Sequence, residues 1–377
     1  MAAQVTDYVD RGICFTHPEV EWQMRFSSDY DWLCNRNRKS DSDEVYSYWP
    51  ESCMYTVDHD VVTRLYEGYM DWNVARNRLE PKIVEWAAAC GRIFSVFPEL
   101  PMEQLSFAHR HYTTTFFMDD PYERSCRKGT GNSFGRAYLH NLRLIFQGET
   151  TGWSDLKCFQ SDRTPSVDVE VALFALDIVK ENRSLGERVL SRDQFDFHLK
   201  TCYLWLDFLS RESKSFEDNV SQGSVSGYSD LLGTRHITCG FELVIAGVLP
   251  SATFTLPLIT PLNPFVHLAA VVVAMDNDIV SVPKERKSGE DQESPSNFFF
   301  TIRNREEDSD MRAVRQLLHR RNAMVKCLHD QIMMMPPGWK HSYLNLLKYT
   351  MSICDFEYVL GHGSPNPRYG FVWHDTA

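Results

Sequence analysis

The residues with the clearest capacity for chemistry form two clusters of oxygen ligands, each at the end of an apolar stretch. The first cluster is the sequence FFMDDPYE at residues 116–123. On a helix, Asp119 and Glu123 lie four residues apart and face the same way, whereas Asp120 points about 100° aside. Two carboxylates on one face repel each other, and a hard cation such as Mg²⁺ between them would remove that repulsion. An acidic helix end that faces solvent accounts for this cluster equally well.

The second cluster is the sequence DNDIVSVPKE at residues 276–285, which follows the apolar run AAVVVAM. Asn277, Ser281 and Glu285 are spaced four residues apart, so on a helix they form one polar stripe. An amide oxygen, a hydroxyl and a carboxylate in a row can all bind one Mg²⁺ ion. A chance polar helix end is the alternative, but packing does not account for a core helix that becomes polar only along this stripe. The second cluster is therefore more specific than the first.

Together the two clusters, DDxxE and NDxxSxxKE, resemble the metal-binding motifs of class I terpene synthases, of the single-domain kind found in microbes and octocorals. Their order agrees with the family, and the dipeptide Arg368-Tyr369 stands where the family has an Arg-Tyr pair. The resemblance covers residues from about 116 to 369. It implies an all-α bundle around a central apolar cavity, and a lyase that ionises a linear prenyl diphosphate, cyclises the carbocation and releases diphosphate.

The resemblance also implies roles for individual residues, all named here by their numbers in this sequence. Asp119 would coordinate two of three Mg²⁺ ions, assisted by Asp120 or Glu123, and Mn²⁺ is an acceptable substitute. The third ion would be held by Asn277, Ser281 and Glu285. The diphosphate would be bound by Lys284, Arg368 and Tyr369. Arg235 would sense the diphosphate, with Thr238 as linker and the backbone carbonyl of Cys239 or Gly240 as effector.

Aromatic rings stabilise a carbocation without reacting with it, and the chain holds 23 Phe, 16 Tyr and 9 Trp. Phe116, one turn before Asp119, is expected to face the cavity; Trp205 and Trp373 are weaker candidates. The second metal helix would face the cavity with Ala270, Val273 and Ala274. Ordinary core packing is the alternative for each aromatic residue. The resemblance favours the C20 substrate geranylgeranyl diphosphate, followed by farnesyl diphosphate.

Two other functions remain open. A prenyl diphosphate synthase would need a second DDxxD motif where this chain has the Asn-Ser-Glu stripe, and a non-catalytic prenyl-diphosphate-binding helical protein would have kept only the fold. A zinc site is not expected, because the ten cysteines form no CxxC pair and His109 and His111 fall on different faces of a helix. The sequence GTGNSFG at residues 129–135 lacks the spacing of a nucleotide-binding loop and indicates a flexible connection.

The composition predicts a cytoplasmic globular protein, and we expect it to be a monomer or a homodimer. The net charge of −12 argues against nucleic acid as a partner, and the N-terminus shows no signal peptide. Residues 243–275 contain no charged side chain, but four prolines interrupt them, so two buried helices are expected in place of a membrane span.

We expect one all-α domain over residues 1–377, with residues 1–60 forming short helices and loops packed on it. Residues 212–230 and 287–297 are polar and are expected to be loops, the latter a candidate lid, and residues 297–303 could form an isolated strand. Pro121 and Pro283 are expected to bend or end their helices. Helices are predicted at 61–69, 83–96, 102–118, 167–180, 193–210, 241–248, 265–282, 311–335 and 342–360.

Overall fold

The structure is a computed structural model that describes residues 14–33, 42–72, 77, 79–127, 133–149, 166–222, 228–249, 264–288, 297–306, 309–358 and 372–374. Only the backbone is described at residues 120, 123–127, 166–168, 212–222, 288, 305–306 and 373–374. The chain forms two compact units. Unit 1 comprises Met1–Asp58, Lys214–Phe241 and Leu262–Ala377, and unit 2 comprises His59–Ser213 and Glu242–Pro261.

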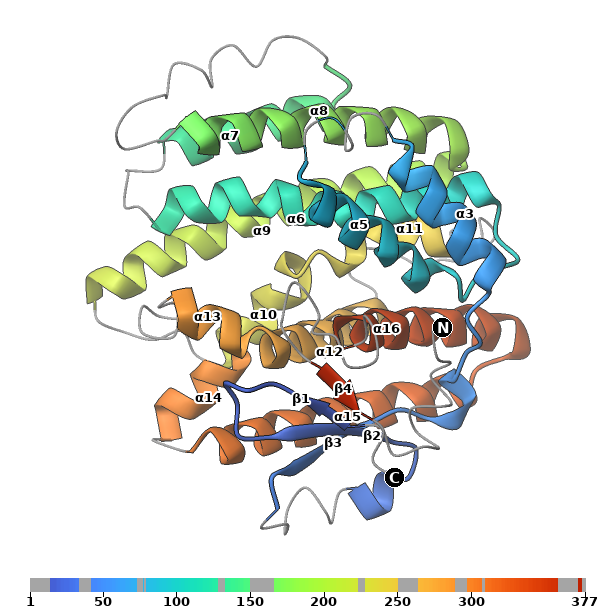
Figure 1. Ribbon diagram of the computed structural model, residues 1–377, viewed down its shortest axis with the longest axis vertical. Coiled ribbons are helices and arrows are strands. Elements are labelled where there is room, and N and C mark those ends of the chain that lie inside the picture. Colours follow the sequence, from blue (N-terminus) through green and yellow to red (C-terminus); the bar gives the residue numbers. More distant parts are fainter. Residues whose placement is uncertain are drawn as a thin grey trace. The chain divides into compact units, whose positions relative to one another are not determined.

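Unit 2 is built around one long helix, α6 (Met102–Arg127), which lies along α8 (Figure 1). A cluster of buried aromatic and aliphatic side chains, among them Tyr69, Trp72 and Phe174, joins the helices around it. Gly247 lets α11 approach α6 closely, because a Cβ atom there would lie 2.7 Å from the Cβ of Ala108. The other elements are α3 (His59–Met70), α5 (Pro81–Ala89), η2 (Cys90–Phe94), α7 (Ser133–Phe146), α8 (Ser166–Val189), α9 (Arg192–Gln222), η4 (Phe241–Val244) and α11 (Ile245–Val248). Helix α9 is divided between the units, because its residues up to Ser213 belong to unit 2 and the rest to unit 1.

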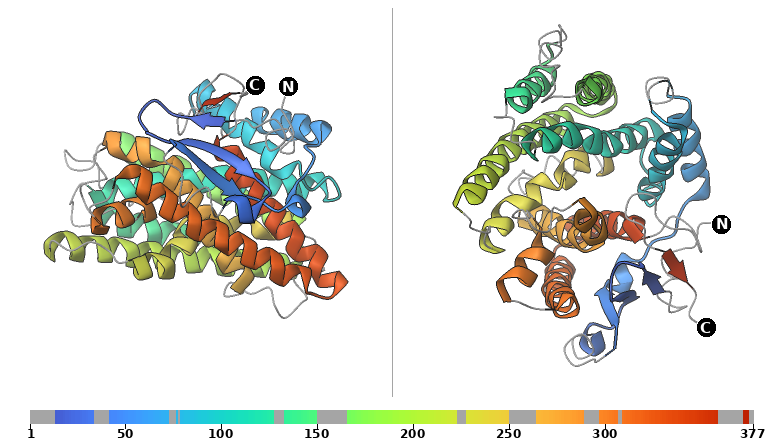
Figure 2. Two further views of the ribbon diagram at one scale, coloured as in Figure 1. Left: turned by 90° about the horizontal axis from the view of Figure 1, so that it is seen from below. Right: turned by 60° about the vertical axis from the view of Figure 1, so that its left-hand side comes forward.

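Unit 1 surrounds α12 (Pro264–Val280), which is apolar on every side and therefore packs against four other helices. These neighbours are α10 (Tyr228–Thr238), α14 (Phe298–Glu306), α15 (Asp310–Met333) and α16 (Pro337–Tyr358), and α13 (Val282–Ser288) follows α12 directly. A small sheet lies against α15 (Figure 2), with the strand order β3-β2-β1-β4. Its strands are β1 (Cys14–Thr16), β2 (Gln23–Ser27), β3 (Glu44–Tyr48) and β4 (Val372–His374), and η1 (Glu51–Cys53) follows β3.

The sheet is fixed to the helices of unit 1 by two polar residues of α15. The Asn322 side chain donates to the Tyr46 carbonyl and accepts from the Tyr48 amide, both at 2.9 Å, as a neighbouring strand would. Arg321 forms a fully buried ion pair with Asp276 of α12 at 2.9 Å. Its guanidinium also lies 4.0 Å from the centre of the Trp49 ring. A charge pair buried in this way couples the sheet, α15 and α12.

The all-α prediction is confirmed, and most helices lie where the sequence placed them; whether the chain is one domain stays a prediction. The structure corrects four details. Residues 14–48 contain three strands, whose short lengths gave no periodic signal, and residues 298–306 form a helix in place of the expected strand. The expected loop at 212–230 is helical up to residue 222. Helix α6 continues past Pro121 to Arg127.

One stretch of the described residues, Tyr228–Val248, is long and apolar enough to cross a membrane, and 72% of its most apolar window is buried inside the protein. The core helix of a globular fold has the same properties, so the stretch is weak evidence for a span. The prediction of buried helices within residues 243–275 holds for α11 and α12. The proline-rich segment 250–263 lies outside the described residues.

The Arg321→Met substitution should lower the free energy of unfolding by about 3–5 kcal/mol, because it leaves Asp276 buried without its counter-ion. Urea unfolding followed by circular dichroism measures this change. The matched control is Lys326→Ala in the same helix, which removes an exposed pair with Asp330 and should cost less than about 1 kcal/mol. Equal losses in both variants would contradict the role given to the buried pair.

Candidate active site

The Asn-Ser-Glu stripe stays on one face even though the helix is interrupted. Helix α12 ends at Val280, Ser281 forms a turn, and α13 starts at Val282. The amide of Ser281 still donates to the Asn277 carbonyl, and that of Glu285 to the Ser281 carbonyl, both at 2.9 Å. Pro283 therefore occupies the first turn of α13, where a missing N–H does not weaken a helix. The helix is interrupted near Pro283 as expected, but the three oxygen ligands still lie on one face.

Two oxygen atoms of the stripe, those of Ser281 and Glu285, lie at the spacing of neighbouring magnesium ligands. Ser281 is buried and donates from its hydroxyl to Oε1 of Glu285 at 2.7 Å. Adjacent corners of an octahedron with Mg–O bonds of 2.0–2.1 Å are about 2.9 Å apart. The Asn277 amide nitrogen donates to Glu357 at 3.1 Å, which fixes the orientation of the amide. The three donor types, together with the spacing of the Ser281 and Glu285 oxygens, therefore fit a Mg²⁺ ion.

Asn297 supports this stripe, and sequence analysis missed it. Its side-chain oxygen accepts from the Phe299 amide at 2.8 Å and caps the N-terminus of α14. Its side-chain nitrogen donates to Oε2 of Glu285 at 2.9 Å, so it holds the carboxylate in place. An Asn directly before the apolar run FFF is an N-cap signal, which could have revealed both the helix and this residue.

The two aspartates beside Asn277 face away from the stripe. Asp276 pairs with Arg321, as described above. Asp278 is fully buried and accepts from the Arg235 guanidinium at 2.7 Å and from the Phe298 amide at 2.7 Å. Burial raises the pKa of Asp278, and Arg235 and the Phe298 amide offset part of that rise. Both aspartates hold neighbouring elements together, and Asn277 alone of the three belongs to the stripe.

Arg235, the expected diphosphate sensor, lies directly beside the stripe. It is half-buried on α10, and besides Asp278 its guanidinium contacts Oδ1 of Asn277 at 3.4 Å. Helix α10 ends at Thr238, and Gly240 takes the left-handed conformation with φ of 76°. The expected helix break after the sensor is therefore present, and Thr238, Cys239 and Gly240 form it. Their linker and effector roles stay predictions.

The first acidic cluster lies in unit 2, on the last turns of α6. Asp119 is half-buried there, and the side chains of Asp120 and Glu123 lie outside the described residues. Phe116 is half-buried and makes edge-on ring contacts with Trp86 and Tyr112, with centroids 5.4 and 5.2 Å apart. These contacts fix the plane of the Phe116 ring.

The remaining expected site residues are only partly described. Lys284 is exposed on α13, Trp205 is buried in α9, and Ala270, Val273 and Ala274 are buried in α12. Arg368, Tyr369 and residues 289–296 of the expected lid lie outside the described residues, as do residues 129–132 of the expected flexible connection. Trp373 is described only as a backbone position in β4.

Glu242 is a second residue that sequence analysis overlooked. It follows the break at Gly240 and is the one acidic residue in the apolar sequence FELVIAGVL at 241–249. It is buried, and neither carboxyl oxygen has a hydrogen-bond partner among the described residues. Burial raises the pKa of Glu242 to about 8. Burial therefore favours the neutral form of the Glu242 carboxyl group.

The comparisons with known proteins agree with these observations. No family model matches the chain. The curated (+)-bicyclogermacrene synthase TS4 of Penicillium expansum is 23% identical over 368 residues, which cover 94% of this chain and 88% of that protein. This similarity over most of both chains supports the expected relation to the class I terpene synthases. The comparisons likewise support the terpene synthase activity that the sequence predicted.

Two solved structures share the terpene synthase fold. The 2-methylisoborneol synthase of Streptomyces coelicolor A3(2), in complex with Mg²⁺ and 2-fluoroneryl diphosphate, matches with a TM-score of 0.59 and 16% identity, over 83% of this chain and 94% of that one. A single-residue variant of cucumene synthase matches with a TM-score of 0.51 and 13% identity, over 79% of this chain and 94% of that one. At these identities the structures confirm the fold.

The Glu242→Gln variant should be more stable than the parent protein at pH 7–8. A carboxyl group whose pKa rises from 4.5 to about 8 on folding destabilises the protein progressively as the pH rises between these values. At pH 7 the amide should recover at most about 3 kcal/mol, and near pH 4 the two proteins should be equally stable. Urea unfolding at pH 4, 6 and 8 measures the difference in the free energy of unfolding between the two proteins. If this difference does not grow with pH, Glu242 is not buried as a neutral acid.

Proposed function

We propose that this terpene synthase ionises a prenyl diphosphate with the help of Mg²⁺ held by Asn277, Ser281 and Glu285, and cyclises the resulting carbocation. The observation that carries the proposal is the oxygen stripe, whose Ser281 and Glu285 atoms lie 2.7 Å apart at the end of an apolar helix. Bound Mg²⁺ would neutralise the charge of the leaving diphosphate. Three ions, with Mn²⁺ as a substitute, remain the expectation from the family motifs.

The second metal-binding set in this proposal is Asp119 with Asp120 or Glu123. Its support is the DDxxE sequence and the half-buried position of Asp119 on an unbroken helix. Lys284, Arg368 and Tyr369 would bind the diphosphate, Lys284 as a point charge and Arg368 as a planar fork.

Arg235 would bind the diphosphate by exchanging partners. Its guanidinium contacts the acceptor oxygens of Asp278 and Asn277, and a diphosphate oxygen competes for the same donors. Release of Asn277 Oδ1 from Arg235 would free that oxygen for the metal. Sensing and metal binding would then be coupled through one side chain, with the break at Gly240 next along the chain.

The aromatic ring of Phe116 would stabilise the carbocation by about 0.5–2 kcal/mol through its π face. Trp86 and Tyr112 make T-shaped contacts with Phe116, so they hold the plane of its ring. Exclusion of water is the second requirement, because water would trap the cation before it cyclises.

We propose farnesyl diphosphate as the preferred substrate. The similar curated protein is named for bicyclogermacrene, a C15 hydrocarbon, and the similar solved structure holds the C10 analogue 2-fluoroneryl diphosphate. Neither name supports the C20 substrate that the sequence resemblance favoured. Geranyl and geranylgeranyl diphosphate are therefore the comparison substrates.

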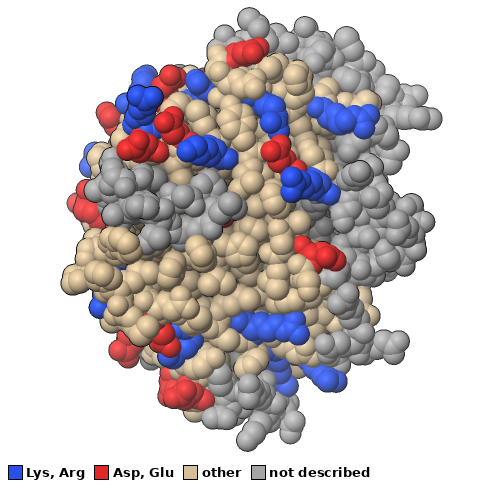
Figure 3. All heavy atoms as spheres, turned by 180° about the vertical axis from the view of Figure 1, so that it is seen from behind, with Lys and Arg blue, Asp and Glu red and all other residues tan. Residues whose placement is uncertain are grey.

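We also propose that the protein acts in the cytoplasm as a monomer or homodimer, without nucleic-acid or membrane partners. The net charge of −12 supports the first exclusion. On the face drawn in Figure 3, basic and acidic side chains of the described residues lie among each other, so no broad basic surface is seen there.

Incubation of the protein with Mg²⁺ and each of the three diphosphates should release a cyclic C15 hydrocarbon from farnesyl diphosphate as the main product. Gas chromatography with mass spectrometry identifies the hydrocarbon, and a phosphate assay after pyrophosphatase measures diphosphate release. Addition of EDTA should abolish both signals and excess Mg²⁺ should restore them. In a further incubation with both farnesyl and isopentenyl diphosphate, formation of a longer prenyl diphosphate would instead identify a prenyl diphosphate synthase. Binding without diphosphate release would identify a non-catalytic binding protein.

Asn277→Ala and Asp119→Ala should each lower kcat roughly 100- to 1,000-fold, because each removes an oxygen that stabilises the leaving group through the metal. Circular dichroism should show an unchanged fold. The matched controls are Asn304→Ala and Asp196→Ala, which replace exposed residues of the same types in the same units. Full turnover in Asn277→Ala would refute the magnesium assignment of the stripe.

A further inference from the structure

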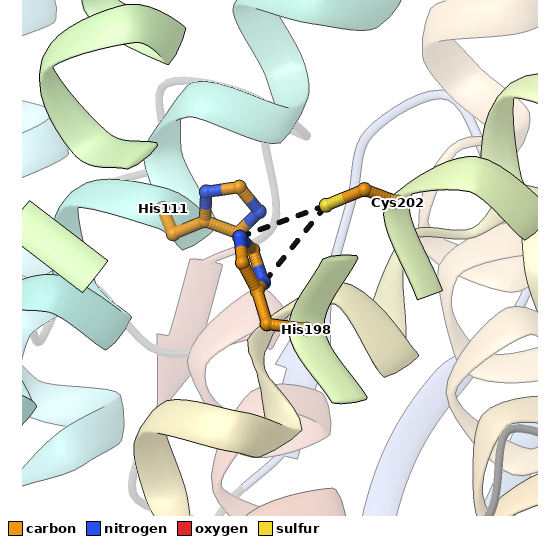
Figure 4. Close-up of side chains that lie close together, drawn as sticks. All are labelled: His111, His198 and Cys202. Atoms are coloured by element: carbon orange, nitrogen blue, oxygen red, sulfur yellow. Dashed lines mark hydrogen bonds between the residues drawn. The ribbon is translucent and has the colours of Figure 1, made fainter. Parts of the chain in front are cut away.

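Three buried side chains of unit 2 form a cluster that the diphosphate chemistry does not use. They are His111 of α6 and His198 and Cys202 of α9, and they point toward one another (Figure 4). One ligand atom from each lies within 4.8 Å of the others. All three side chains are at most 1% exposed. Two imidazoles and one thiol are the donors that thiophilic transition metals prefer.

The cluster is arranged as a chelate. His198 and Cys202 are four residues apart on α9 and so share one helix face. The Leu243 carbonyl lies 3.1 Å from Nδ1 of His198 and accepts its proton, which leaves the lone pair on Nε2. That Nε2 atom lies 3.6 Å from the Cys202 sulfur. Around one metal with M–N near 2.1 Å and M–S near 2.3 Å, the two atoms are about 3.6 Å apart. These two ligands are thus already in place.

His111 is the observation that points to a missing ligand. Neither of its ring nitrogens has a hydrogen-bond partner among the described residues. A neutral imidazole must bury one N–H group and one lone pair, and each costs about 1–3 kcal/mol when unsatisfied. A metal ion between the three side chains would accept that lone pair. Movement of the ring by roughly 1 Å would bring its nitrogen to bonding distance.

The surroundings orient the two imidazole rings toward each other. Phe107, one turn before His111, stacks on that ring at 5.6 Å and meets His198 edge-on at 5.2 Å. Two glycines allow this close packing: a Cβ atom at Gly186 would lie 2.7 Å from the Phe107 ring, and one at Gly247 would lie 3.1 Å from it. The cluster therefore has the fixed, apolar shell of a structural metal site.

We propose that His111, His198 and Cys202 bind one thiophilic transition-metal ion, Zn²⁺ or Cu⁺, which joins α6 to α9. Cu⁺ accepts three ligands, whereas Zn²⁺ usually takes four. The ion replaces the thiol proton of Cys202, which passes to solvent as the metal–sulfur bond forms. Sequence analysis excluded zinc from the spacing of His109 and His111. His109 and His111 do point in different directions. The partners of His111 are instead on α9, and they lie 87 and 91 residues further along the chain.

The protonation states of the cluster favour metal over protons at the histidines. Burial lowers the pKa of His198 to about 4, and burial with the neighbouring His198 lowers the pKa of His111 well below its usual value. Burial raises the pKa of the Cys202 thiol, so proton competition is confined to the sulfur. Metal binding should release one proton per ion.

Elemental analysis by mass spectrometry of the full-length protein, purified without a histidine tag or chelator, should find about one Zn or Cu per chain. Cys202→Ala and His111→Phe should lose the ion. The matched controls are Cys90→Ala, a buried cysteine of the same unit, and His109→Phe, whose ring bonds the Ala87 carbonyl at 2.7 Å; both should keep it. Asp119→Ala should also keep the ion while it loses turnover, which separates this proposal from the proposed magnesium chemistry.

A spectroscopic measurement on the parent protein tests the proposal even if the variants fail to fold. The metal-free parent protein loaded with Co²⁺ should show the near-ultraviolet charge-transfer band of a cobalt–thiolate bond. Added Zn²⁺ should raise the melting temperature of the parent protein and leave that of Cys202→Ala unchanged. A parent protein that holds no Zn or Cu, takes up neither and shows no cobalt–thiolate band would overturn the proposal. Retention of the ion by Cys202→Ala would overturn it as well.

Discussion

The arrangement of the stripe depends on one buried carboxylate, Asp278. A fully buried carboxylate is stable only with partners that replace water. Asp278 has two, the Arg235 guanidinium on α10 and the backbone amide of Phe298 at the start of α14. It therefore joins α10, α12 and α14 at the point where α12 becomes polar. Removal of either partner would leave the buried carboxylate of Asp278 with one partner and would weaken this junction.

The functional residues follow from this junction. The start of α14 places Asn297 against Glu285, and the position of α10 places Arg235 against Asn277. The same guanidinium thus has a structural partner in Asp278 and a site partner in Asn277. A diphosphate that attracts Arg235 would weaken a bond that holds unit 1 together. Ligand binding and local order would for that reason be linked through Arg235 and Asp278.

Much of the fold and of the candidate site could be predicted from the sequence. The features that could not be predicted were missed for physical reasons. Asn277, Ser281 and Glu285 could be found because core packing alone gives an apolar helix no reason to carry three unlike oxygen ligands at helical spacing. Asn297 was not predicted as a site residue, because a short polar stretch before FFF indicates a loop followed by a strand as readily as an N-cap followed by a helix. Strands β1 to β3 were not predicted because they are only three to five residues long, and because β3 is held to α15 by Asn322, a contact between residues far apart in the sequence. Contacts such as His111 with His198 and Cys202 join residues far apart in sequence, which no local pattern reveals.

A crystal structure with Mn²⁺ and a fluorinated farnesyl diphosphate would test the central claim most directly, because the anomalous signal of manganese locates the metal without assumption. The expected result is an anomalous peak within bonding distance of Asn277 Oδ1, Ser281 Oγ and a Glu285 oxygen, with the Arg235 guanidinium bound to the diphosphate. A diphosphate bound with no manganese at these three residues would contradict it.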